Sequence, residues 1–101
     1  MADGTTVTRT IAITNERGLH ARAAAKFTEL AGTFACDVSV SNGRESVSGR
    51  SIMGLLMLAA AKGEEISISA SGADAALALD ALCALIADGF GEDREDGEPK
   101  A

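Results

Sequence analysis

The sequence predicts an α+β fold: an open-faced two-layer sandwich in which a four-stranded antiparallel sheet carries three helices on one face. Four segments alternate polar and apolar residues, which is the pattern of strands that have one face in the core. Three other segments place apolar residues at helical spacing. Along the 101 residues these segments follow the order β-α-β-β-α-β-α, which suits a single two-layer domain.

The predicted strands are short and are separated by turn residues. They cover residues 6–14, 37–41, 45–48 and 65–70. The middle two flank Asn42-Gly43, which between alternating segments is the strongest short-range signal of a β-hairpin. Arg9 interrupts the apolar face of the first strand, so we expect this strand to end there or to lie at an edge of the sheet.

The predicted helices cover residues 21–31, 52–59 and 73–90. Gly18, in the loop before the first helix, is free to adopt a left-handed conformation, and Gly32 stops that helix. Ser51 is a favoured N-cap for the second helix. The third helix is the longest, and its apolar stripe consists of Leu79, Leu82, Ile86 and Phe90.

The composition argues against several classes of protein. The net charge is −6, with no basic stripe and only three aromatic residues, so we expect no nucleic-acid partner. No apolar run approaches the roughly 20 residues that span a bilayer, and a signal-peptide pattern is absent, so we expect no membrane partner and a cytoplasmic location. Cys36 and Cys83, with one histidine, do not form a zinc spacing. We expect two buried thiols, with a disulfide as the weaker alternative, and no metal or cofactor.

The two parts of the chain differ in composition. Residues 1–90 contain the apolar segments and form the predicted domain. Residues 91–101 carry five acids against two bases and the only proline of the chain. Such a segment cannot bury enough apolar surface to order itself, so we expect residues 91–101 to be a disordered, solvated tail.

The candidate reactive residue is His20, the only histidine of the chain, which lies directly before the first predicted helix. A lone histidine is more often an ordinary surface residue. Here the amides at the start of a helix and Arg22, two residues further on, can hold an anion beside the ring. Because a neutral imidazole is a nitrogen nucleophile near pH 7, this arrangement favours a site for a transferable phosphoryl group.

The second predicted helix has two further features. Ser51 caps it, and the same helix end also suits a phosphate on the Ser51 hydroxyl. The helix is too short to bury apolar residues all round, so we assign Leu55 and Leu58 to the core. We expect partner proteins to dock on an exposed apolar surface made of Leu19, Ile52, Met53 and Leu56.

Two other functions remain open on the residues alone. A regulatory binding module could use the exposed apolar surface and transfer nothing. A hydrolytic enzyme needs a base, a nucleophile and an orienting group together. The chain has one histidine and no obvious carboxylate beside it, which makes hydrolysis the weakest of the three hypotheses.

Four blocks of sequence, in order and at compatible spacing, resemble the HPr family of phosphocarrier proteins. They are residues 18–22 (GLHAR), 49–56 (GRSIMGLL), 61–66 (AKGEEI) and 69–72 (SASG). The resemblance extends from about residue 6 to residue 90 and implies the family's fold. It implies that His20 accepts a phosphoryl group at Nδ1 and that Arg22 stabilises it. It also implies that Ser51 matches a serine that a dedicated kinase phosphorylates in some bacteria.

The resemblance implies the partners as well: a phosphoenolpyruvate-dependent Enzyme I as donor, an Enzyme IIA-type domain as acceptor, and an HPr serine kinase/phosphorylase for Ser51. The chain would then be a phosphoryl-transfer intermediate rather than a free-standing catalyst, and we expect it to be a monomer. Ala23 stands where many family members carry proline, so the first helical turn is less preorganised. With residues 24–27, Ala23 makes the chain similar to the nitrogen-related, NPr-like branch rather than the sugar-uptake branch.

Overall fold

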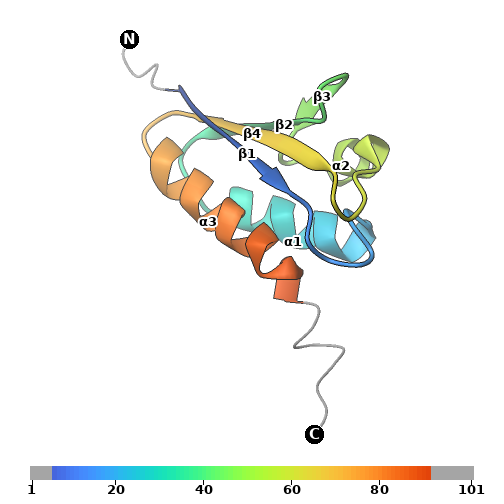
Figure 1. The fold of residues 1–101 in the computed structure, drawn as a ribbon. Helices are drawn as coiled ribbons and strands as arrows, with labels where there is room; N and C mark the ends of the chain where they lie inside the picture. The colour runs from blue at the N-terminus through green and yellow to red at the C-terminus, as the bar shows by residue number, and fades with distance from the viewer. Residues whose placement is uncertain (1–5, 92–101) are drawn as a thin grey trace, which may run out of the picture.

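A computed structural model describes residues 6–91, and their elements follow the predicted order (Figure 1). The strands are β1 (Thr6–Ala12), β2 (Asp37–Ser41), β3 (Ser46–Ser48) and β4 (Glu65–Ser71). The helices are α1 (Ala21–Ala31), α2 (Ile52–Leu58) and α3 (Ala75–Ala87), followed by a 3₁₀ helix, η2 (Gly89–Gly91). Apart from Gly91, the predicted acidic tail lies outside the described residues.

The four strands form one antiparallel sheet in the order β1-β4-β2-β3. One face is apolar, as the alternation predicts, because every second side chain of a strand points to the same side. Its buried residues include Val38, Val40, Ile66, Ile68 and Ala70. The predicted hairpin joins β2 to β3, and Gly43 in its loop has a φ of +94°.

The opposite face of the sheet is lined with hydroxyl groups. Threonines of β1 face serines of β4, and the hydroxyl oxygens of each pair are 2.9–3.0 Å apart. The three pairs are Thr6 with Ser71, Thr8 with Ser69, and Thr10 with Ser67. Cross-strand hydrogen bonds of this kind stabilise an antiparallel pair while the surface stays polar. The sheet therefore needs no second layer on this side.

β1 is an edge strand, which confirms the expectation drawn from Arg9. Arg9 alternates with the threonines, so it lies on the helix side of the sheet. From there its guanidinium reaches Asp80 of α3, with Nη2 2.9 Å from Oδ1. At the edge of a sheet, a long charged side chain can extend past the apolar layer, so that its charged group stays in water.

The helices cover the apolar face of the sheet. α1 and α3 lie side by side along it, whereas α2 packs against α1 and β3 at one end (Figure 1). The largest fully buried side chains are Phe27, Phe90, Ile13, Leu55, Ile68, Leu82, Ile86 and Val40. Because these residues come from all three helices and the sheet, one shared core sets the position of α1 relative to α2. Within residues 6–91, no helix has the length and apolar character needed to cross a membrane.

The third helix is shorter than the prediction over residues 73–90. α3 spans Ala75–Ala87, and Gly89 and Phe90 then take φ values of +65° and +58°, which end the helical backbone. Phe90 is buried nevertheless, as are the other members of the predicted stripe. The Thr14 hydroxyl donates to the carbonyl oxygen of Ile86 at 2.8 Å, so a loop side chain binds a carbonyl near the helix end.

Cys36 and Cys83 are buried free thiols, as expected. Burial raises the pKa of Cys36, although the nearby Arg50 acts in the opposite direction. The Arg50 guanidinium donates to the carbonyl oxygens of Cys36 and Phe34, at 2.8 Å and 3.2 Å. Arg50 therefore holds the loop between α1 and β2 against the start of α2.

Candidate functional site

His20 is the N-cap residue of α1, which covers the predicted residues 21–31. Its backbone is extended (φ −82°, ψ 179°), and its carbonyl accepts a helical hydrogen bond from the Ala24 amide at 2.8 Å. The imidazole is half-buried and does not cap the helix. The first-turn amides are therefore not bound by this ring, and they can bind an anion placed beside it.

The loop before His20 is held against the segment that follows α2. Gly18 has the predicted left-handed backbone, with a φ of +64°. A Cβ atom at Gly18 would lie 2.5 Å from the carbonyl oxygen of Ala60, which is too close for any side chain. The Leu19 amide donates to the same oxygen at 2.9 Å. Because only glycine permits this approach, the contact with Ala60 sets the point from which α1 starts.

Arg22 is exposed in the first turn of α1, two residues after His20. That turn contains no acidic residue of its own, so none of its side chains offsets the positive end of the helix dipole. Backbone amides, dipole and guanidinium all favour an anion at this helix end. Among the described residues, His, Cys, Asp and Glu side chains form no group of three that could hold a metal ion. The turn that follows His20 is therefore suited to an anion.

Ser51 is the N-cap of α2, as predicted. Its hydroxyl oxygen accepts a hydrogen bond from the Gly54 amide at 2.9 Å. α2 packs against α1, so Ser51 lies on a helix that directly contacts the helix bearing His20. The second candidate site and the first therefore belong to one packed pair of helices.

The predicted docking residues do not all share one surface. Ile52 and Met53 are exposed, Met53 to 70%, whereas Leu56 is half-buried. The prediction for Leu19 is wrong, because its side chain is only 4% exposed and belongs to the core. The hydrogen bond from its amide to Ala60 draws this part of the loop against the protein, which turns the leucine inward.

Met57 is an exposed apolar residue that the sequence argument missed. Its side chain is 71% exposed, and it lies four residues after Met53, on the same side of α2. The i, i+4 spacing of the two methionines is the signal that could have identified it. We define the apolar docking surface as Ile52, Met53, Met57 and the half-buried Leu56.

Two further side chains near the site were also missed. Asn15 is only 7% exposed, and its Nδ2 donates to the carbonyl oxygen of Gly18 at 2.8 Å. Lys26 of α1 donates from Nζ to the carbonyl oxygen of Phe90, also at 2.8 Å. The hydrogen bond of Lys26 joins residues that are far apart in the chain, so no local sequence pattern predicts it. That of Asn15 spans three residues and is typical of asparagine in a turn.

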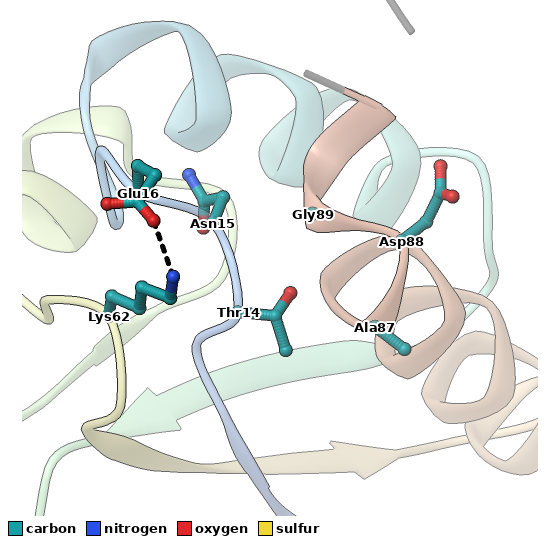
Figure 2. A pocket seen from close by; sticks show the side chains of 7 residues that line it. All are labelled: Thr14, Asn15, Glu16, Lys62, Ala87, Asp88 and Gly89. Carbon is teal, nitrogen blue, oxygen red and sulfur yellow. Dashed lines mark hydrogen bonds and ion pairs between the residues drawn. The ribbon is translucent and has the colours of Figure 1, made fainter. Parts of the chain in front are cut away.

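Figure 2 shows the surroundings of Asn15, which lines a cavity of about 310 Å³. The other lining residues are Thr14, Glu16, Lys62, Ala87, Asp88 and Gly89. An ion pair between Lys62 and Glu16 links the segment after α2 to the His20 loop. The cavity therefore lies between this loop and the C-terminal end of α3, which Thr14 also joins directly through its bond to Ile86.

A comparison with known protein families shows to which family the chain belongs. A family described as "PTS HPr component phosphorylation site" matches residues 7–88. The chain belongs to the HPr family. It is a phosphocarrier protein of the phosphotransferase system, and the recognised blocks around His20 and Ser51 lie inside the matched region.

Relatives of this HPr-family chain match it over most of their length. Phosphocarrier protein HPr of Cupriavidus necator is 49% identical over 84 residues, which cover 83% of this chain and 94% of the relative. Phosphocarrier protein NPr of Shewanella violacea is 42% identical over 88 residues, covering 87% and 97%. The crystal structure of HPr-C-His from Thermoanaerobacter tengcongensis matches with a TM-score of 0.81 at 39% identity, covering 84% and 96%. The fold is thus the HPr fold, and the relatives carry both the HPr and the NPr name.

Proposed function

We propose that His20 accepts a phosphoryl group from a phosphoenolpyruvate-dependent Enzyme I and passes it to an Enzyme IIA-type domain. The observation that carries this proposal is the position of the only histidine of the chain, half-buried at the N-cap of α1 with a ring that does not cap the helix. A phosphoryl group on that ring would lie beside the first-turn amides and the positive end of the helix dipole.

The transfer exchanges one P–N bond for another. Nδ1 of His20 attacks the phosphorus of a phosphohistidine on Enzyme I, and the new bond forms as the bond to the donor nitrogen breaks. The donor ring carries a proton on its other nitrogen, so it takes the electron pair of the broken bond and leaves as a neutral imidazole. A histidine of the acceptor then removes the group from His20 in the same way. The chain therefore contributes positioning and charge stabilisation rather than covalent assistance.

We assign the stabilisation of the phosphoryl oxygens to Arg22. A guanidinium offers paired N–H donors in a planar geometry that suits phosphate. Arg22 is exposed in the turn that follows His20, so a group delivered from a partner protein can reach it. Its fixed charge offsets the negative charge that arrives on the ring.

We assign partner recognition to the apolar docking surface on α2. Exposed apolar side chains that gather on one helix mark a surface for another protein. Two of its four residues are methionines, whose flexible side chains adapt to partners of different shape. A small surface of this kind suits a carrier, which must leave each partner after transfer.

The same helix suggests a regulatory site. We propose that Ser51 is the residue on which an HPr serine kinase/phosphorylase would act, as the resemblance implies. A phosphate there would stand next to Ile52 in the sequence and would place negative charge beside the docking surface. From family membership we also infer a monomeric carrier that works in the cytoplasm.

The decisive experiment is incubation of the protein with phosphoenolpyruvate and purified Enzyme I, followed by measurement of its mass. We expect wild type to gain one phosphoryl group that acid removes and base does not, and we expect His20→Ala to gain none. Labelling of His20→Ala at the wild-type rate would exclude His20 as the acceptor. An unlabelled wild type would favour the regulatory binding module instead.

The role of Arg22 is tested in the same assay. We expect Arg22→Ala to fold like wild type and to accept the phosphoryl group about tenfold more slowly or worse, because a charged donor to the phosphoryl oxygens is lost. Arg44→Ala is the matched control, since Arg44 is an exposed arginine in the β2–β3 loop. Equal rates for the two variants would remove Arg22 from the site.

A further inference from the structure

Asn15 is the one polar residue that the structure buries between residues 6 and 91, with 7% of its surface exposed. A buried amide is costly unless it is hydrogen-bonded, so its contacts indicate what it is there to hold. Its Nδ2 donates to the carbonyl oxygen of Gly18 at 2.8 Å. Its own carbonyl accepts from the Gly18 amide at 3.2 Å, so the backbone and the side chain of Asn15 both bind the same residue.

The Gly18 carbonyl connects Asn15 to His20. The same oxygen accepts a hydrogen bond from the His20 amide at 2.9 Å. Asn15 therefore fixes the orientation of the peptide group to which the backbone of His20 is bound. On the other side of the turn, the Ala60 carbonyl binds the Leu19 amide and leaves no room for a side chain at Gly18. The peptide before His20 is thus held from both sides.

The space around Asn15 explains why the turn depends on this side chain. Asn15 lies between the turn and the end of α3, and a Cβ placed on Gly89 would be 3.6 Å from the Cβ of Asn15. The cavity of about 310 Å³ in Figure 2 opens beside it. The side chain of Asn15 thus binds the Gly18 carbonyl at the edge of this cavity, between the turn and the end of α3.

We propose that Asn15 is a positioning residue for phosphoryl transfer at His20. It acts without touching the phosphoryl group: its amide holds the Gly18 carbonyl, which holds the backbone of His20 at the start of α1. The proposal rests on the proposed function of His20. A displacement of about 1 Å at a reacting group can change a rate by up to about 100-fold, so loss of this hydrogen bond can slow the transfer.

The test compares Asn15→Leu with Thr14→Val. Each variant removes a side-chain hydrogen bond of 2.8 Å and keeps the branched shape and the number of heavy atoms of the side chain, but the bond of Thr14 goes to Ile86 of α3. We expect Asn15→Leu to accept the phosphoryl group from phosphorylated Enzyme I about tenfold more slowly than wild type. We also expect its phosphorylated form to lose the group to water more quickly, because the ring no longer holds it against the amides. Thr14→Val should match wild type in both measurements.

A purely structural role would lower the stability of Asn15→Leu and leave both rates per folded molecule unchanged, which would overturn the proposal. Asn15→Asp is the second variant, in case Asn15→Leu does not fold. Its carboxylate keeps the size of the amide but turns the contact with the Gly18 carbonyl repulsive, and both rates should move as for leucine. If wild type is labelled and neither variant differs from it, only the role of Asn15 fails. If wild type itself takes up no phosphoryl group, the proposed function fails first and the role of Asn15 falls with it.

Discussion

The Leu19 amide donates to the carbonyl oxygen of Ala60 at 2.9 Å, and this hydrogen bond ties the loop before His20 to the segment after α2. The two helices that carry the candidate sites are therefore joined by backbone as well as by packing. The two segments also approach so closely at Gly18 that a Cβ atom there would overlap the Ala60 carbonyl oxygen.

We predict that Gly18→Ala loses more stability than the same substitution at other glycines with a positive φ. A left-handed alanine costs about 1–2 kcal/mol, and at Gly18 its Cβ would also overlap the Ala60 carbonyl at 2.5 Å. Gly43→Ala and Gly63→Ala are matched controls, because both glycines have positive φ and nothing lies within 4 Å of the added Cβ. Urea unfolding of the three variants checks this, and equal losses would show that the contact with Ala60 is unimportant.

We predict that a charge at position 51 slows phosphoryl transfer while the helix remains capped. Both aspartate and asparagine cap helices well, so Ser51→Asp and Ser51→Asn should show the circular dichroism of wild type. Only the aspartate places a charge beside the docking surface, where a partner must desolvate it. We expect a several-fold lower rate for Ser51→Asp alone. A similar rate for both variants would argue against Ser51 as a switch.

We predict that Met57→Asp impairs transfer without unfolding the protein. Met57 is 71% exposed, so the charge should change the free energy of unfolding by no more than about 0.5 kcal/mol. Within the docking surface it should reduce kcat/KM with Enzyme I by about tenfold. Leu77→Asp on α3 is the control, because Leu77 is 63% exposed and lies outside this surface. If Leu77→Asp is equally impaired, the effect comes from net charge and not from docking.

We predict that Cys36 makes stability fall at alkaline pH. Burial raises its pKa in the folded protein, whereas an unfolded thiol titrates near 8.5, so the unfolded chain releases the proton first. The contribution is fully present below about pH 8.5 and is lost as the pH rises through the raised folded pKa. Urea midpoints at pH 7 and pH 9.5 should therefore drop further for wild type than for Cys36→Ala. An identical drop in both proteins would contradict the expectation.

The elements of the fold could be predicted because their signals are local. Alternation in the strands and the apolar spacing of α1 depend only on neighbouring residues. The start of α2 is predictable because Ser51 is a favoured N-cap residue. The predicted third helix is too long because Phe90 continues its apolar spacing. In the structure the backbone of Phe90 has a φ of +58° and is no longer helical. The apolar periodicity indicates which residues are buried, and Phe90 is buried although it lies beyond the end of the helix.

The candidate site was predictable in part for the same reason. His20, Arg22 and the helix start are adjacent in the sequence, so their arrangement follows from one turn of α1. The burial of Leu19 depends on Ala60, which is distant in the chain, and no pattern around Leu19 shows it. Residues next to a reactive group are thus predictable when helix geometry places them, and not when a tertiary contact does.

The hydrogen bond from Lys26 to the Phe90 carbonyl also bears on how the protein should be handled in the laboratory. Because η2 is held on α1 and Gly89 lies close to Asn15, the described part of the chain reaches Gly91 beside the loop that carries His20. β1 begins opposite Ser71, at the end of the strand away from that loop. Fusions for pull-down or surface immobilisation are therefore better placed at the amino terminus.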